Sequence, residues 1–337
     1  MDDPDSRQYV AYACNDHIAT IALDRPEKLN AVSDEVVRQL MAAFRRFDSD
    51  PEAYVAILCG RGRAFCSGAD VHRRQLRSRA ELERLGGPQG HGANAGDLLF
   101  QSVNWKPVIA AVHGYVLGLG LGMVLDRDLI VAEAGTRFQL TETSRGLGAA
   151  KHWAQFHFRG AGAFGDDVSL TGRYFSAEEA LAANVINRVA PRGEFMDAAM
   201  VLAQQVAANP PLSVRATVRT RRWFLDRYAK EAAFQQAPMR LYLTEDFHEA
   251  ALAFKEKRSR VVSMGGRIAH GPDDARPCRY DWVWQPGPYR APALRPGLRP
   301  ADFFAGGGGA MATRLRPRPI FLASSDRVSA YFGATIG

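Results

Sequence analysis

Apolar residues in the first sixty positions form short runs, and this pattern predicts strands. Residues 9–14 and 17–23 each have the length and the β-branched or aromatic content of one strand. The two residues between them, Asn15 and Asp16, suit a tight hairpin turn. Residues 54–59 form another apolar run, so a third strand is predicted there.

The segment between the second and third of these runs has a helical period instead. Its apolar residues recur at three- or four-residue spacing and share one helix face. They are Val36, Leu40, Phe44 and Phe47. Ser33 suits the N-cap of this helix, and Pro51 ends it. Because strands alternate with a helix, the pattern indicates an α/β architecture in which helices cover a sheet.

The stretch from Trp105 to Gly146 carries the candidate chemistry. Val108 to Val112 is a continuous apolar run that predicts a buried strand, and glycines follow at positions 114, 118, 120 and 122. A strand that passes through a glycine turn into a helix exposes backbone N–H groups at the positive end of the helix dipole. Such groups suit an oxygen that carries or develops negative charge.

Two further features supply the other parts of a catalytic site. Ser67, Gly68 and Ala69 lie between a predicted strand and a predicted helix, so a ligand can approach the backbone there closely and the Ala69 N–H points outward. Glu142 is a lone carboxylate among apolar and hydroxyl-bearing residues, twenty positions after Gly122. Taken alone, these features also fit an ordinary tight turn and an ordinary loop carboxylate.

Length and composition limit the classes of protein that need to be considered. The chain has 337 residues, 47% of them hydrophobic, which is enough for one large domain or two small ones. No apolar stretch is long enough to span a membrane and the start MDDPDSRQ does not suit a signal peptide, so we expect a cytoplasmic protein with no membrane partner. The cysteines at 14, 59, 66 and 278 show no paired spacing, which predicts reduced thiols and no metal.

The net charge of +7 is concentrated near the C-terminus. Residues 263–337 contain ten Arg, five Asp and neither Lys nor Glu, which gives +5 and leaves about +2 for the preceding 262 residues. The main body therefore has no basic stripe, and we expect no nucleic-acid partner. The same tail contains nine Pro and eleven Gly without a regular period, which predicts disorder.

Two other interpretations of the tail stay open. Trp282, Trp284 and Tyr289 suit an interaction segment. The Arg-rich, Lys-free composition also fits translation of a GC-rich gene in a shifted frame. Peptide mapping of the protein from its native host separates these interpretations, because a shifted frame predicts that tail peptides such as DWVWQPGPYR are not found.

Six segments of the main body resemble the crotonase, or enoyl-CoA hydratase/isomerase, superfamily, and they follow the order found in that family. They are IALDRPEKLNAVS at 21–33, VAILCGRGRAFCSGAD at 55–70, WKPVIAAVHGYVLGLG at 105–120, DLIVAEAGTRF at 128–138, LTGRYFSAEEALAANVINRVAP at 170–191 and EDFHEAALAFKEKR at 245–258. They extend over about residues 8–260, roughly three-quarters of the chain. The tail resembles nothing in the family.

The resemblance implies a fold, an assembly and a class of substrate. The expected α/β fold is a crotonase-like spiral of ββα units in residues 1–192, followed by a helical trimerisation region in 193–262 and the disordered tail in 263–337. The expected assembly is a homotrimer or a dimer of trimers. The expected substrate is an acyl-CoA thioester, whose coenzyme A is part of the substrate, with no further cofactor.

The resemblance also implies residue roles. Ala69 and Leu119 would hold the thioester oxygen through their backbone N–H groups as it becomes an enolate, and Glu142 would be the acid–base group. Each such donor typically lowers the barrier by roughly 3 kcal/mol. The expected substrate-binding positions are Lys28, Ala31, Ser67, Gly68, Asp70, Gly118, Phe254 and Lys257. For Lys257, a solvated charge in a run of charged residues is an equally simple interpretation.

The sequence departs from the hydratase pattern at one acid–base position. Family hydratases use two glutamates, and the first corresponds to Gly122, which has no side chain. The surroundings of Glu142 resemble those in single-glutamate Δ3,Δ2-enoyl-CoA isomerases. One carboxylate suffices for isomerisation, because the same group can remove a proton at C2 and return it at C4. We therefore favour double-bond migration over hydration.

Three other residues near the proposed site have ordinary interpretations that we favour. Asp126 lies four residues after Gly122, about 6 Å further along the helix axis, and suits a solvated or salt-bridged position. His152 is a candidate auxiliary acid or base, but a surface or core-edge histidine is the simpler interpretation. Cys66 suits a small buried filler.

Other function classes compete with the enoyl-CoA isomerase. A hydratase, or another acyl-CoA lyase or hydrolase of the same fold, is the nearest alternative. A non-catalytic acyl-CoA-binding or scaffold protein is favoured by Gly122 and by the unusual segment after Gly146. A dinucleotide enzyme is disfavoured, because Met123 stands where the third glycine of the GxGxxG turn belongs.

Overall fold

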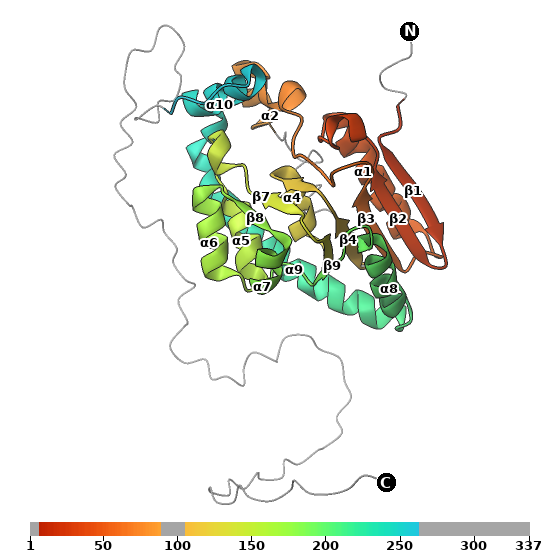
Figure 1. The fold of residues 1–337 in the computed structure, drawn as a ribbon. Helices are drawn as coiled ribbons and strands as arrows, with labels where there is room; N and C mark the ends of the chain where they lie inside the picture. The colour runs from red at the N-terminus through yellow and green to blue at the C-terminus, as the bar shows by residue number, and fades with distance from the viewer. Residues whose placement is uncertain (1–6, 89–104, 263–337) are drawn as a thin grey trace, which may run out of the picture. The chain divides into compact units, whose positions relative to one another are not determined.

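The computed structural model describes residues 7–88 and 105–262 (Figure 1). By its contacts the chain divides into two units, Met1–Arg279 and Tyr280–Gly337, and all described residues belong to the first. The tail at 263–337, predicted to be disordered, lies outside the described residues. The predicted division of the main body at residue 192 stays a prediction.

The elements alternate along the chain as the apolar pattern predicts. The strands are β1 (Val10–Asn15), β2 (Ile18–Leu23), β3 (Val55–Gly60), β4 (Val108–Val112), β5 (Tyr115–Leu117), β6 (Leu129–Glu133), β7 (Arg137–Gln139), β8 (Tyr174–Ser176) and β9 (Arg188–Ala190). The α-helices are α1 (Asp34–Ser49), α2 (Arg79–Leu85), α4 (Leu119–Leu125), α5 (Ala150–Phe158), α6 (Gly162–Thr171), α7 (Ala177–Ala182), α8 (Phe195–Ala207), α9 (Pro211–Gln236) and α10 (Glu245–Glu256). Short helical segments are η1 (Pro26–Lys28), η2 (Val71–Gln75), η3 (Thr143–Arg145), η4 (Ala237–Met239) and η5 (Leu241–Leu243).

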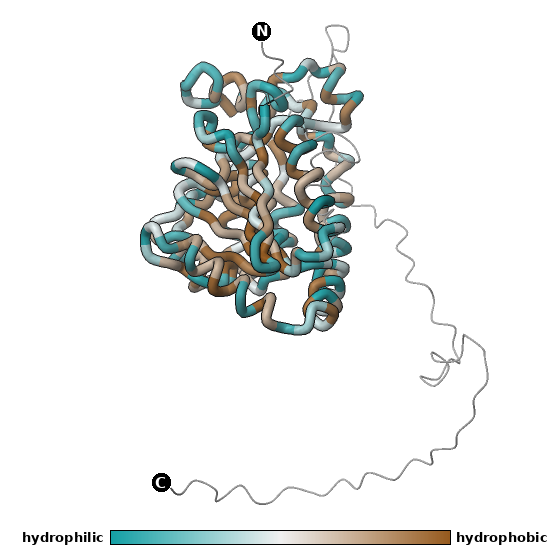
Figure 2. The backbone as a smooth tube through the Cα atoms, turned by 90° about the vertical axis from the view of Figure 1, so that its right-hand side faces the viewer, coloured by the Kyte–Doolittle hydropathy of each residue, from teal (hydrophilic) through white to brown (hydrophobic). Residues whose placement is uncertain are grey.

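A six-stranded sheet in the order β1-β2-β3-β4-β6-β9 forms the centre of this unit. β1 and β2 are antiparallel, and every later neighbouring pair in this sheet is parallel. β3 and β4 are buried along their whole length, which explains their continuous apolar runs. A smaller sheet has the order β5-β7-β8, and its strand β5 ends directly before Gly118. Figure 2 shows the apolar strands inside and polar residues on the outer helices.

Helices cover both sides of the large sheet. α1 packs against β1 and β2, whereas α8 packs against β3, β4 and β6. α8 belongs to the region expected to be a helical C-terminal part, so that region contributes to the cover of the sheet. α2 and α10 lie side by side (Figure 1), and both pack on η5, with Leu82, Leu243 and Phe247 in one small apolar cluster. No helix among the described residues meets the length and apolar content needed to cross a bilayer.

Local sequence signals locate several of these elements closely. The Ser33 hydroxyl caps α1 and accepts a hydrogen bond from the Val36 N–H at 3.4 Å. The predicted strand Val108–Val112 matches β4. The first hairpin turn, however, is wrong by one residue: Asn15 pairs with Ile18, and the turn consists of Asp16 (φ 47°) and His17 (φ 65°). Both turn residues adopt the left-handed conformation that a two-residue hairpin of this hand requires.

Candidate active site

Two turns that are fifty residues apart in the chain lie against each other. The Cys66 N–H donates to the Tyr115 carbonyl at 3.0 Å, and the Leu117 N–H donates to the Cys66 carbonyl at 3.0 Å. A Cβ atom on Gly68 would lie 3.0 Å from the Leu117 carbonyl oxygen and 3.8 Å from the Leu119 nitrogen. The turn at 66–69 and the start of α4 therefore form one continuous backbone surface.

The backbone N–H groups of Ala69 and Leu119 are left for a ligand. Val32 uses both of its backbone groups in the bridge beside Ala69, because its N–H donates to the Gly68 carbonyl and its carbonyl accepts from the Asp70 N–H. The Ala69 N–H consequently faces away from Val32. Leu119 is the first residue of α4, where an N–H has no partner within the helix. Neither N–H donates to an acceptor within residues 7–88 and 105–262.

Gly118 shapes this surface and brings it to Glu142. Its backbone angles, φ 48° and ψ −117°, suit glycine alone, and a Cβ atom there would lie 2.3 Å from the Thr141 Oγ1. The same Cβ position is 3.5 Å from the Glu142 Oε1. The glycine turn predicted from the sequence thus lies next to the predicted acid–base group.

Glu142 is buried, with 9% of its surface exposed. Its Oε2 atom is shielded from solvent and accepts no hydrogen bond from the described residues. Its Oε1 atom lies 3.7 Å from the Nε2 of His152. A carboxylate oxygen without a donor in a dry site is well suited to accept a proton from a bound molecule.

His152 is the second titratable group at the site. It lies on α5 and is 5% exposed. Burial lowers the pKa of His152, while the Glu142 carboxylate and a backbone hydrogen bond with Gly118 act in the opposite direction. The favoured interpretation of a core-edge histidine matches its burial but missed its contact with Glu142. The unusual segment after Gly146 was the only sequence signal near this residue.

Several predicted substrate-binding residues gather beside Ala69. Lys28 is exposed at the end of η1, and its carbonyl accepts a hydrogen bond from the Ser67 hydroxyl at 3.4 Å. Ala31 and Asp70 are joined by the buried guanidinium of Arg25, which donates to the Ala31 carbonyl at 3.0 Å and to the Asp70 carboxylate at 2.8 Å. The segment 25–31 and the turn at 67–70 are therefore held as one rigid rim.

The other two predicted substrate-binding residues lie on α10. Phe254 is 49% exposed, and the Arg145 guanidinium stacks on its ring at 4.2 Å. Lys257 is exposed and ends α10 in the left-handed conformation. α10 packs against η2 and η3, which directly follow Asp70 and Glu142 in the chain. The helix thus borders the site, and substrate contacts by Phe254 and Lys257 stay a prediction.

Two ordinary interpretations from the sequence are confirmed. Asp126 is buried and forms an ion pair with Arg127 at 3.1 Å, so it is salt-bridged as expected, although it is not solvated. Burial raises its pKa to about 6. Cys66 is fully buried, and burial raises the pKa of its thiol to about 12, which makes it a filler rather than a nucleophile.

The sequence model of the family described as enoyl-CoA hydratase/isomerase matches residues 13–262. The chain belongs to this family. It is therefore an enzyme of the crotonase fold that acts on acyl-CoA, and both the expected family and the expected fold are confirmed.

Curated relatives of the enoyl-CoA hydratase/isomerase family align over nearly their whole length. The mevalonyl-coenzyme A hydratase sidH of Aspergillus fumigatus is 33% identical over 248 residues, which cover 72% of this chain and 90% of the relative. A carnitinyl-CoA dehydratase of Proteus mirabilis is 34% identical over 251 residues, covering 72% and 93%. The crystal structure of a carnitinyl-CoA hydratase from Mycobacterium avium superposes with a TM-score of 0.64 at 30% identity and covers 77% of this chain and 99% of that chain.

Proposed function

We propose that this enzyme removes a proton from the carbon next to an acyl-CoA thioester and moves a double bond. Glu142 acts as the base, and the N–H groups of Ala69 and Leu119 form the oxyanion hole. The observation that carries the proposal is the buried Oε2 of Glu142 beside two backbone donors, all three without a hydrogen-bond partner in the described part of the chain. No cofactor other than the coenzyme A of the substrate takes part.

The chemistry follows from the charge that develops on the substrate. Glu142 takes the proton at C2 of a 3-enoyl-CoA, and the electrons of the broken C–H bond form a dienolate whose negative charge lies on the thioester oxygen. The Ala69 and Leu119 N–H groups stabilise that oxygen, each by roughly 3 kcal/mol. Together they lower the barrier by about 6 kcal/mol, or about four orders of magnitude in rate. Return of the proton at C4 gives the 2-enoyl-CoA.

Hydration or dehydration across C2 and C3 is the second candidate reaction. It needs one group to activate water and another to handle the C2 proton. Gly122 has no side chain and cannot be the second group. The observation that favours hydration is that the Nε2 of His152 lies 3.7 Å from the Oε1 of Glu142. The relatives named hydratase or dehydratase support the same candidate.

A panel of acyl-CoA thioesters distinguishes the two reactions. Wild-type enzyme and Glu142→Gln are incubated with a 3-enoyl-CoA and with a 2-enoyl-CoA. The products are separated by chromatography, and their masses are measured by mass spectrometry. Isomerisation changes retention time without changing mass, whereas hydration adds one water. We expect conversion of the 3-enoyl-CoA that Glu142→Gln abolishes. Tight binding without turnover of either thioester would instead indicate a scaffold protein and contradict the proposal.

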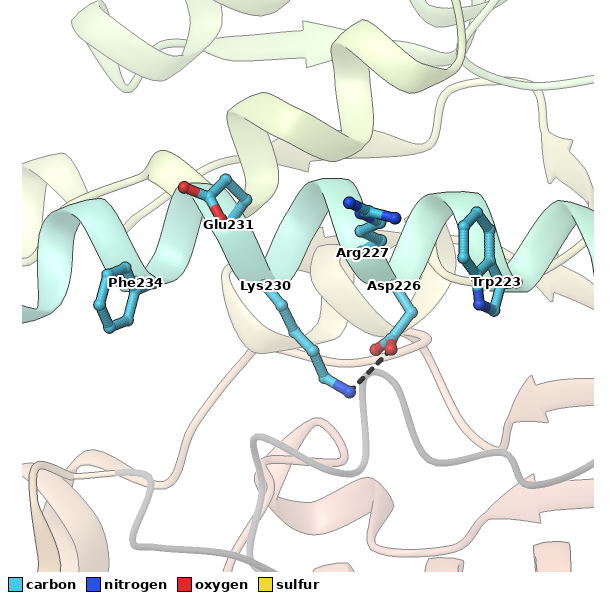
Figure 3. A pocket seen from close by; sticks show the side chains of 6 residues that line it. All are labelled: Trp223, Asp226, Arg227, Lys230, Glu231 and Phe234. Carbon is cyan, nitrogen blue, oxygen red and sulfur yellow. Dashed lines mark hydrogen bonds and ion pairs between the residues drawn. The ribbon is translucent and has the colours of Figure 1, made fainter. Parts of the chain in front are cut away.

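We also propose a homotrimer or a dimer of trimers. The long helix α9 carries exposed aromatic side chains, among them Trp223 (55% exposed) and Phe234 (71% exposed). They border a shallow hollow of about 470 Å³ whose rim includes the ion pair between Lys230 and Asp226 (Figure 3). Exposed apolar groups of this size on one helix support an interface. Light scattering coupled to size-exclusion chromatography measures the mass, and a monomer at micromolar concentration would contradict the assembly.

A further inference from the structure

His152 contacts two parts of the proposed active site, which are Glu142 and the backbone of Gly118. Its Nε2 faces the Glu142 Oε1 at 3.7 Å and has no hydrogen-bond partner in the described residues. The ring also makes a hydrogen bond with the backbone of Gly118. Since Nε2 has no partner among these residues, we assign this bond to Nδ1.

The Gly118 bond decides which nitrogen carries the proton. The Gly118 N–H donates to the Gln139 carbonyl at 2.9 Å, whereas the Gly118 carbonyl accepts from the Gly122 N–H at 3.0 Å and has a second lone pair that can accept from His152. A carbonyl only accepts, and therefore the Nδ1 of His152 donates. In the neutral ring the Nε2 atom then carries a lone pair, and this lone pair is directed at the Glu142 carboxylate.

A lone pair and a carboxylate oxygen are two acceptors with no proton between them. The 3.7 Å between them is longer than a hydrogen bond, which agrees with this assignment. Once Glu142 has taken a proton, its O–H can donate to the Nε2 of His152, or the proton can cross to give an imidazolium beside a carboxylate. The pair is therefore arranged to hold one additional proton.

The Gly118 bond also reaches the oxyanion hole. The carbonyl of Gly118 and the N–H of Leu119 belong to one peptide group. A donor at that carbonyl polarises the peptide and strengthens its N–H as a donor. When His152 gains a proton, positive charge appears next to this peptide at the moment that negative charge develops on the thioester oxygen.

We propose that His152 is a positioning residue that couples Glu142 to the Gly118–Leu119 peptide and shares the proton that Glu142 removes from the substrate. The step is balanced: the C2–H bond breaks, its electrons enter the enolate, and the proton lies on Glu142 or on the Nε2 of His152 until it returns to carbon. This inference rests on the proposed function for its substrate, and it holds for double-bond migration and for dehydration alike, because both reactions break the C2–H bond.

The charged groups that act on His152 are few. Glu142 lies before η3, and Lys151 precedes His152 on α5 and lowers its pKa. Asp126 of α4 interacts with Lys151, and its own ion pair is with Arg127. The described residues of α9 contribute none of the charges that act on this ring. Glu142 is therefore the one group among these that favours the protonated ring.

The test compares two variants on one helix in the full-length protein. His152→Asn places an amide donor near the position of Nδ1 and removes Nε2. His157→Asn is the control, because His157 also lies on α5 but contacts Asp166 at 3.0 Å near the surface. We expect His152→Asn to lower kcat by about 100-fold with KM little changed, and to move the acidic limb of the rate profile to lower pH. His157→Asn should match the wild type in both.

Nuclear magnetic resonance of the imidazole gives a readout that needs no turnover. In the wild type, the ring of His152 should be protonated on Nδ1 and unprotonated on Nε2 at neutral pH. In Glu142→Gln, the pKa of His152 should fall further, because the carboxylate that opposes the effect of burial has been removed. Thermal unfolding confirms that each variant is folded.

The outcomes separate this inference from the proposed function. Wild-type rates and an unmoved rate profile in His152→Asn overturn the role of His152 even if thioesters are turned over. A ring protonated on Nε2, or a pKa of His152 that does not respond to Glu142→Gln, also overturns it. If no thioester is turned over while both ring signatures are found, the proposed function fails and the coupling of His152 to Glu142 is supported.

Discussion

Replacement of Gly118 by alanine tests whether the backbone at this turn positions the oxyanion hole. The new Cβ would lie 2.3 Å from the Thr141 Oγ1, whereas ordinary contacts begin at 3.4 Å. The turn or the Thr141 side chain must therefore move by about 1 Å, and φ of 48° with ψ of −117° adds backbone strain for any residue with a side chain. The Leu119 N–H belongs to the peptide bond that follows Gly118, so this donor moves when the turn moves.

The expected effect is large on turnover and small on the remainder of the protein. A displacement of about 1 Å at a reacting group typically costs about 100-fold in rate. Steady-state kinetics with the thioester that the panel identifies measures this loss. Gly162→Ala is the control, since its Cβ would meet only the His157 ring, at 3.7 Å, in ordinary contact at the start of α6. It should leave the rate unchanged.

A second substitution separates the steric contact from other causes. Thr141→Ala removes the Oγ1 atom that Gly118→Ala would strike, so the double variant should recover part of the lost rate. The reasoning is refuted if Gly118→Ala retains wild-type kcat/KM while folded. It is also refuted if Gly118→Ala loses thermal stability but shows no loss of rate per folded molecule.

Three further results are expected. Glu142→Gln should lower kcat by about 1,000-fold with thioester binding retained, as measured by steady-state kinetics and calorimetry; wild-type kcat would contradict the assignment of the base. Because burial raises the pKa of Asp126 from 3.8 to about 6, the native state holds more protons than the unfolded state between these values, so its contribution to the free energy of unfolding falls as pH rises from about 4 to 6. Asp126→Asn should flatten the dependence of the free energy of unfolding on pH, as measured by urea unfolding. An unchanged dependence would contradict the raised pKa of Asp126. Asp70→Asn should lower the free energy of unfolding by about 3 kcal/mol, since it leaves the buried Arg25 guanidinium without its carboxylate; a change below about 0.5 kcal/mol would show that the rim does not depend on this pair.

The local parts of the fold and site are those that the sequence predicts best. The Ser33 cap, the strand before the glycines and the turn at Gly118 each depend on a few neighbouring residues, and the structure has them where predicted. The hairpin turn was misplaced by one residue, because Asn15 and Asp16 suit a turn as well as Asp16 and His17 do. Here the pairing of Asn15 with Ile18 decides the position.

Contacts between distant segments were beyond the sequence patterns. Arg25 reaches Asp70 across 45 positions, and neither residue has a local signal for the pair. His152 lies only ten residues after Glu142, but the two are joined by η3 and the start of α5, whose relative orientation no period encodes. The sequence therefore showed the candidate base and the candidate donors, but not that His152 lies 3.7 Å from Glu142.

Deuterium placed at C2 of the thioester gives the most direct test of enolate formation. The wild-type enzyme is incubated with the labelled 3-enoyl-CoA, and mass spectrometry with nuclear magnetic resonance follows the label. With both C2 hydrogens replaced by deuterium, we predict that one of the two labels leaves C2, appearing at C4 or in water, with a primary isotope effect on kcat, and that both stay at C2 in Glu142→Gln. Conversion of the thioester by the wild type with both labels still at C2, or loss of a label from C2 that is equally fast in Glu142→Gln, would contradict the account.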